Sequence, residues 1–284
     1  MLIIQKGLNM ATERILLLQP IFCPSDAQFQ RNADSIISIG EYIKANKITN
    51  VECQFGGWCS SPELWSKLIS VLKVYFPNNE IVSFKNNVGK AVTINFLAKK
   101  HLKPHHEFIM SVDSDMVFPL ATENFFDRMI KASEFATAYK KVPFGLIAPQ
   151  QLEHGCHLGD CFQNNYQFDS GVNGKIYKEK LVWPHGAGGI AGGLLMFSRR
   201  AWEVIGGYRV MGIYSGDDAY ALLAIGNKGF SYQVLESAGI IHPRDTDLTY
   251  AQWKVTVCQR DSGADKTDLL PFIEEAEKFW KERE

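Results

Sequence analysis

Two aspartates, Asp113 and Asp115, stand directly after the apolar run Phe108–Val112. A continuous apolar run of this length is typical of a buried strand in a parallel sheet. In an open α/β sheet the ligand crevice lies at the carboxyl ends of the strands, where carboxylates can hold a cation and a polyanionic ligand together. Because Asp-x-Asp sequences also cap turns and helices, the interpretation depends on the rest of the chain.

Three further sets of polar residues stand at comparable positions. Asn87–Lys90 lies between a predicted strand and a predicted helix, where backbone N–H groups and a lysine can face a phosphate. Asp217 and Asp218 precede a helical pattern, and His242 closes a late apolar strand. Carboxylates and phosphates together suit Mg²⁺, and an imidazole ligand favours Mn²⁺. The other interpretations are a helix cap for the acidic pair and a backbone-bonded histidine.

Strand and helix patterns alternate through the chain. The predicted strands lie at 14–19, 51–55, 81–84, 108–112, 144–148, 194–197 and 232–235, and the predicted helices at 27–45, 61–75, 88–99, 125–135, 200–205 and 220–225. This alternation predicts an α/β fold with a Rossmann-like, mostly parallel central sheet, right-handed crossovers and flanking helices. Gly56–Gly57 is expected to end the second strand.

The segment Gln151–Pro184 has few periodic apolar residues and is predicted to be an irregular lid or binding loop. Its aromatic side chains could stack on a sugar or a base, or pin the loop to the core: Phe162, Tyr166, Phe168, Tyr177 and Trp183. The group His154, Cys156, His157 and Cys161 fits no standard zinc spacing, so a structural metal is the less favoured interpretation. Trp183, His185 and Gly186 are candidates for an acceptor platform, with a tight packing turn as the alternative.

Composition limits the class of protein. The chain has 284 residues, a formal charge of -1 and 46% hydrophobic residues, so no global positive field attracts nucleic acid or membranes. No apolar run reaches the roughly 18 residues of a membrane span, and the first 14 residues lack a signal-peptide core, so a cytoplasmic location without a membrane partner is expected. We expect an N-terminal arm at 1–13, one catalytic domain at 14–248 and a C-terminal helical extension at 249–284.

The joint order of these motifs resembles the metal-dependent nucleotide-sugar glycosyltransferases of the GT-A fold, especially the inverting group called family 2. The resemblance spans about Ile15–His242 and rests on Asn87-x-Gly89-x(5)-Asn95, the Asp-x-Asp pair, the block Gly192–Arg199 with Gly206-Gly207-Tyr208, the acidic pair with Gly229-Phe230, and the late histidine. It implies a GT-A fold, a divalent metal, Mn²⁺ or Mg²⁺, and a nucleotide-diphosphate sugar as donor substrate.

The resemblance also implies roles for the polar residues. Asp115 would bind the metal directly, Asp113 would reach the donor ribose or a metal-bound water, and His242 would complete the protein ligands. Asp218, beside Asp217, would be the general base that takes the acceptor proton.

The donor side follows from the same resemblance. The residues expected to border or flank the nucleotide are Gln19, Phe22, Asn87, Gly89, Lys90, Asn95 and Asp113.

Two other functions remain open. A nucleotidyltransferase would be expected to carry a Gly-rich basic loop after the first strand, and Gln19–Ser25 has no Gly, Lys or Arg. A non-catalytic sugar-nucleotide binding module is the second alternative. The acceptor could be a soluble glycan, a protein, a small molecule or a hydroxymethylated DNA base. A DNA acceptor would bind to a local basic face formed by Lys85, Lys90, Lys99, Lys100, Lys175, Lys178 and Lys180.

Overall fold

The structure is a computed structural model that describes residues 14–153, 162–184, 190, 192–210, 213, 217–243, 250, 252, 253 and 256. The expected arm at 1–13, the Cys/His group at 154–161, the acceptor candidates His185 and Gly186 and most of the extension at 249–284 lie outside the described residues. No described helix has the length and hydropathy needed to cross a lipid bilayer.

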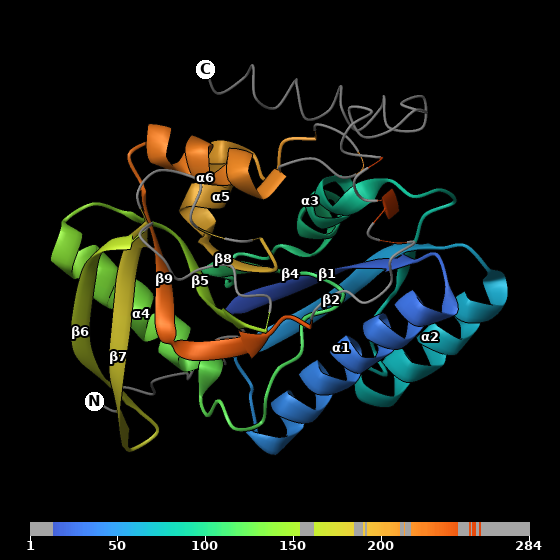
Figure 1. The fold of residues 1–284 in the computed structure, drawn as a ribbon, viewed down its shortest axis with the longest axis horizontal. Coiled ribbons are helices and arrows are strands. Elements are labelled where there is room, and N and C mark those ends of the chain that lie inside the picture. Colours follow the sequence, from blue (N-terminus) through green and yellow to red (C-terminus); the bar gives the residue numbers. More distant parts are fainter. Residues whose placement is uncertain are drawn as a thin grey trace, which may run out of the picture.

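A nine-stranded sheet runs through the molecule (Figure 1). Its order is β3 (Val82–Ser83), β2 (Val51–Cys59), β1 (Ile15–Cys23), β4 (Phe108–Val112), β8 (Leu194–Ser198), β5 (Phe144–Leu152), β9 (Ser231–Ile241), β7 (Lys175–Pro184), β6 (Phe162–Val172). Strands β3, β2, β1 and β4 are parallel, β8 runs antiparallel to both β4 and β5, and β9 is parallel to β5. Strand β7 is antiparallel to β9 and to β6, so seven of the nine described strands run in one direction, which confirms the mostly parallel sheet.

Helices cover both faces of this sheet. The helices are α1 (Asp26–Ala45), α2 (Pro62–Tyr75), α3 (Gly89–His101), α4 (Phe125–Lys140), α5 (Arg199–Ile205) and α6 (Asp217–Asn227). Figure 1 shows α1 and α2 on one side and α3, α5 and α6 on the other. In β1, Ile15 and Leu17 pack into the core under α1, α2 and α4, whereas Leu16 and Leu18 pack under the other three helices. A strand buried on both faces explains the unbroken apolar run.

The prediction of an irregular lid or binding loop at 151–184 is wrong. Its first two residues complete β5, and 162–184 forms the antiparallel β6–β7 hairpin. Asn173 and Gly174 make the turn with φ values of 49° and 77°, as a two-residue type I′ turn requires. The Asn-Gly pair was the available signal, but the polar, charged flanks hid the strand pattern.

Strand β2 also differs from expectation, because it continues through Gly56 and Gly57 to Cys59. A Cβ atom on Gly57 would lie 2.0 Å from the carbonyl oxygen of Ile21, so glycine permits the close approach of β1 and β2.

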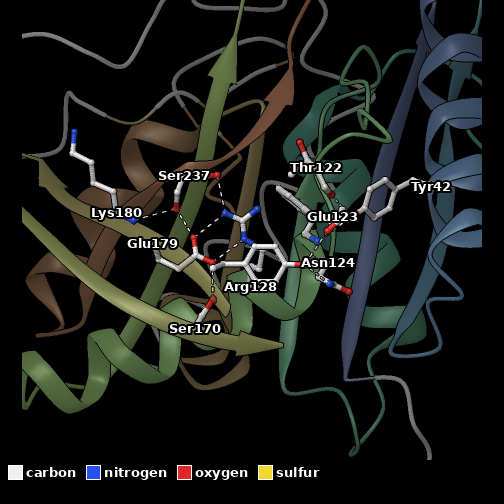
Figure 2. A network of polar contacts seen from close by, with 11 residues as sticks. Tyr42, Thr122, Glu123, Asn124, Arg128, Ser170, Glu179, Lys180 and Ser237 are labelled. Atoms are coloured by element: carbon white, nitrogen blue, oxygen red, sulfur yellow. Dashed lines mark hydrogen bonds and ion pairs between the residues drawn. The ribbon is translucent and has the colours of Figure 1, made fainter. Parts of the chain in front are cut away.

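A buried ion pair ties the hairpin to the rest of the domain (Figure 2). Arg128 on α4 donates from Nε and Nη2 to the two carboxylate oxygens of Glu179 on β7, at 2.7 and 2.9 Å. Ser170 on β6 and Ser237 on β9 also donate to that carboxylate, and Arg128 reaches the Ser237 carbonyl at 2.7 Å. One carboxylate thus joins four elements.

Candidate active site

The carboxyl edge of the sheet gathers most of the predicted polar residues. Asp113 and Asp115 follow β4, and His242 follows β9. Lys90 lies in the first turn of α3 and forms an ion pair with Asp113, Nζ to Oδ1, at 2.7 Å. The structure therefore brings residues from distant parts of the sequence to one place.

Asp115 and His242 face one another at this edge. Asp115 Oδ1 and His242 Nε2 are 3.6 Å apart, and the side chains are only 14% and 16% exposed. Arg31 on α1 pairs with the other oxygen, Oδ2, at 2.7 Å. Burial alone would raise the pKa of Asp115, but the imidazole of His242 and the guanidinium of Arg31 outweigh burial and lower it. Asp115 is therefore ionised at neutral pH.

Lys90 sits between the first aspartate and the acidic pair. Its Nζ also donates to the Gly192 carbonyl at 2.8 Å. Burial would lower the pKa of Lys90, but the charges of Asp113 and then of Asp217 and Asp218 raise it well above the usual value. Lys90 is a fixed positive charge.

The acidic pair begins helix α6. Burial raises the pKa of Asp217 to about 6, Lys90 opposes this shift, and Asp218 adds to it. Asp217 Oδ2 is buried, with no hydrogen-bond partner among the described residues. Asp218 Oδ1 accepts the N–H of Ala219 at 2.9 Å. A carboxyl with a pKa near 6 can exchange a proton close to neutral pH.

Two glycines directly before β8, Gly192 and Gly193, leave space for side chains at this edge. A Cβ atom on Gly192 would lie 2.1 Å from Asp218 Oδ2. A Cβ atom on Gly193 would lie 3.0 Å from the amide atoms of Gln151 and 2.8 Å from the sulfur of Met116. The Gly-Gly sequence is needed because the side chains of Asp218 and Gln151 approach the backbone itself.

The residues of the Asn-x-Gly motif, which were expected to border the nucleotide-sugar donor, make hydrogen bonds with the protein backbone. Asn87 Oδ1 accepts the N–H of Gly89 at 3.0 Å, and Gly89 has a φ of 81°. Asn95 bonds both the N–H and the carbonyl of Tyr208, at 2.9 and 2.7 Å. These contacts fix the start of α3 and join it to the segment after α5.

Gln19 and Phe22, from the end of β1, take different positions. Gln19 is buried, and its Nε2 donates to Ser35 Oγ at 2.6 Å and to the Asp113 carbonyl at 3.2 Å. It supports the turn that carries Asp113.

Phe22 stacks on Trp58 and Trp253, with ring centroids 5.7 and 5.0 Å apart. This aromatic group stands at the same edge as Asp113.

Trp183 does not join these residues. It lies at the end of β7 in a cluster with Tyr139 and Tyr166, under Lys140. Because Leu181 and Val182 pair with the first half of β9, Trp183 stands toward the edge opposite His242.

Arg31 and Gln151 are residues that the sequence analysis missed. Arg31 contacts Asp115, and Gln151 Oε1 lies 2.9 Å from His242 Nδ1. Both side chains act across tertiary contacts, and neither falls in a recognisable motif. The only signal was the position of each residue near the carboxyl end of a strand or the start of the following helix.

The group of charges at this edge is acidic. Among the described residues, four carboxylates (Asp113, Asp115, Asp217, Asp218) lie with two basic side chains (Lys90, Arg31), which gives a formal charge of -2 with His242 counted as neutral. Such a site favours a divalent cation.

A second group of potential metal ligands lies at the opposite edge of the sheet. Ligand atoms of Glu52, His105 and His106 lie within 4.8 Å of one another. Glu52, however, already pairs with Lys103 at 2.8 Å, and His106 Nδ1 accepts the Lys103 N–H at 3.1 Å. The proton of a neutral His106 is then on Nε2, 3.2 Å from Glu52 Oε2, so contacts within the protein already engage Glu52 and His106.

Comparisons with known proteins concern the fold. Models of protein families gave no match, and neither did the curated proteins. Among solved structures, S. aureus TarS 1-349 aligns with a TM-score of 0.51 and 10% identity, over 81% of this chain and 60% of that chain. GalNAc-T7 with UDP, GalNAc and Mn²⁺ aligns with a TM-score of 0.55 and 12% identity, over 82% and 43%. TarS 1-349 in complex with UDP aligns with a TM-score of 0.50 and 11% identity, over 84% and 62%.

These neighbours are glycosyltransferases of the GT-A type. The chain has the GT-A fold. It spans less than two thirds of the length of each of these structures. At this level of identity the likeness establishes the architecture, and the chemistry must be argued from the residues.

Proposed function

We propose that this protein is a metal-dependent glycosyltransferase that moves a hexosyl or pentosyl group from a nucleotide-diphosphate donor to an acceptor hydroxyl, with inversion. The observation that carries the proposal is the meeting of Asp115 and His242 at the carboxyl edge of a GT-A sheet, 3.6 Å apart. In open α/β sheets this edge is where ligands bind.

The residues at this edge fit a divalent cation. Asp115 is held in its ionised form, and its Oδ1 faces His242 Nε2. When His242 Nδ1 carries the proton that is donated to Gln151, Nε2 is the nitrogen that would bind a cation beside Asp115 Oδ1. Asp115 and His242 would hold the ion, with Asp113 beside it, and Mn²⁺ suits this mixed oxygen and nitrogen set better than Mg²⁺. The ion supplies charge neutralisation for the leaving diphosphate.

The acidic pair supplies the base in this proposal. The acceptor oxygen forms a bond to the anomeric carbon while the bond from that carbon to the diphosphate oxygen breaks, and the acceptor proton passes to the Asp218 carboxylate. A single displacement of this kind inverts the anomeric centre. The neighbouring charge of Lys90, fixed between Asp113 and the acidic pair, stabilises the negative charges that meet here.

The nucleoside would bind next to the ion. The aromatic group of Phe22 and Trp58 offers a stacking surface at the ends of β1 and β2, and Asn87, Gly89 and Lys90 would border the phosphates. Two of the structural neighbours were solved with UDP, so UDP-sugars are the first donors to test. The candidate acceptors are a soluble glycan, a protein or a hydroxymethylated DNA base.

A thermal-shift panel tests this function. Nucleoside diphosphates and their sugars are added with Mn²⁺ or with EDTA, to wild type, Asp115→Asn and a control variant, Asp169→Asn, which changes an exposed acid of the hairpin. At about 100 times its Kd one nucleotide should raise the Tm by roughly 5–10 °C with Mn²⁺ alone. Asp115→Asn should lose this shift, and Asp169→Asn should keep it. A panel without any metal-dependent shift, or a full shift in Asp115→Asn, would refute the proposal.

A further inference from the structure

We propose that Arg31 and Gln151 are positioning residues that aim one atom of Asp115 and one atom of His242 at the same cation. The inference rests on the proposed function, since it concerns the metal of that site. Neither residue belongs to the motifs that indicate the fold.

Arg31 determines which oxygen of Asp115 is available. Its Nη2 donates to Oδ2 at 2.7 Å, which leaves Oδ1 directed at His242. The same nitrogen donates to the carbonyl of Pro243 at 3.1 Å, so one guanidinium joins the turn after β4 to the residue after His242. The side chain is only 17% exposed, and a charge-assisted contact of this kind keeps its geometry. Arg31 thereby fixes both the carboxylate and the segment that carries the imidazole.

Gln151 does the equivalent for His242. Its Oε1 lies 2.9 Å from Nδ1 and accepts the imidazole proton there, which leaves Nε2 as the ligand atom. Gln151 is buried, and Gly193 provides the room that its amide occupies. The backbone N–H of His242 donates to the Leu152 carbonyl at 3.1 Å, so both the main chain and the ring are anchored on β5.

The two contacts therefore converge on one point. The Arg31 guanidinium selects Oδ1 of Asp115, and the Gln151 amide selects Nε2 of His242, and these two atoms face one another. Contacts that orient metal ligands are typically worth about 10–100-fold in metal affinity. Loss of either contact should therefore weaken metal binding without removing a ligand.

Mn²⁺ affinity in the presence of saturating UDP tests the inference. Free Mn²⁺ is followed by its EPR signal during titration of wild type, Arg31→Met and Gln151→Leu. Each variant should bind Mn²⁺ about 10–100-fold more weakly. Gln151→Glu keeps an acceptor for the imidazole N–H and should bind at least as tightly as wild type. Circular dichroism confirms that each variant is folded.

The matched control is Arg14→Met. Arg14 also pairs with a carboxylate, that of Glu107, at 2.7 Å, but this pair is exposed and lies at the opposite edge of the sheet, so its loss should leave the Mn²⁺ affinity unchanged. Tighter Mn²⁺ binding by Arg31→Met would show that the guanidinium competes with the ion, and unchanged binding by Arg31→Met or Gln151→Leu would show that the contact does not position a ligand. Either result overturns the inference while the proposed function stands. Absence of Mn²⁺ binding by wild type with UDP would refute both.

Discussion

Two buried groups of charges in this domain are built in opposite ways. Glu179 has one cationic partner, Arg128, and each of its carboxylate oxygens accepts two hydrogen bonds from Arg128, Ser170 or Ser237. At the carboxyl edge of the sheet, Asp115 Oδ1 faces an imidazole nitrogen at 3.6 Å, which is too long for a hydrogen bond. Asp217 Oδ2, in the same group, is buried without a hydrogen-bond partner among the described residues.

This difference is the one expected between a structural group and the binding group of the proposed function. A buried charge is tolerated when its pairing is complete, and the group around Glu179 meets that condition. Among the described residues, the acidic edge has two more carboxylates than basic side chains, and Asp115 Oδ1 faces His242 Nε2. Such an arrangement costs stability in the free protein and is offset when a cationic ligand binds. Variants of the two groups should therefore affect different observables.

The largest effect is expected from Asp218→Asn. Loss of a general base typically lowers kcat by about 10²–10⁴-fold, whereas the affinity for Mn²⁺ and UDP should change little because the ligands remain. Transfer rates and the nucleotide thermal shift measure the two quantities. A variant with wild-type kcat would remove Asp218 from the role of base.

The next largest effect is expected in the structural group. Glu179→Gln leaves the Arg128 charge buried and unpaired, which should lower the free energy of unfolding by about 3–5 kcal/mol. The double variant Arg128→Met/Glu179→Leu should recover part of that loss, because both charges are removed together. Urea denaturation measures the free energy of unfolding of each variant. The affinities for Mn²⁺ and UDP should be unchanged in both variants. Loss of nucleotide binding in folded Glu179→Gln would contradict the separation of the two groups.

A smaller effect is expected when a methyl group is added at the acidic edge. Gly192→Ala places a Cβ atom where Asp218 Oδ2 lies, so the carboxylate must move. Overpacking typically costs about 1–3 kcal/mol, and the same energy added to the activation barrier would lower kcat by roughly tenfold or more. Gly171→Ala on β6 is the matched control, since its Cβ would meet no atom within 4 Å. Equal activity of the two alanine variants would show that the position of Asp218 is not critical.

The smallest effect is a pH dependence confined to the structural group. Burial would raise the pKa of Glu179, but hydrogen bonds from Arg128, Ser237 and Ser170 outweigh burial and lower it. A lowered pKa in the folded state means that the stabilisation is complete above the unfolded pKa of about 4.3 and is lost as the pH falls below it. The difference in unfolding free energy between wild type and Glu179→Gln should therefore be constant from pH 6 to 8 and shrink below about pH 4.3. A constant difference down to pH 3 would contradict this.

The sequence predicted residues whose position follows from the strand they end or the helix they begin. Asp113, Asp115, Lys90 and His242 were placed at one edge because parallel strands share it. Arg31 and Gln151 could not be found in this way, because their roles depend on side chains that cross from α1 and β5 to partners far along the chain. The β6–β7 hairpin was missed although Asn173-Gly174 marks it, since alternating charged residues obscured the strand period.

The central claim is that Asp115 and His242 share one cation with a nucleoside diphosphate. Pulsed EPR of Mn²⁺ bound with UDP tests it most directly, because a directly bonded imidazole couples its ¹⁴N nucleus to the electron spin. We predict this coupling in wild type, its loss in His242→Gln, and loss of bound Mn²⁺ in Asp115→Asn. Coupling that persists in His242→Gln, or Mn²⁺ bound with UDP but without any imidazole coupling in wild type, would contradict the claim.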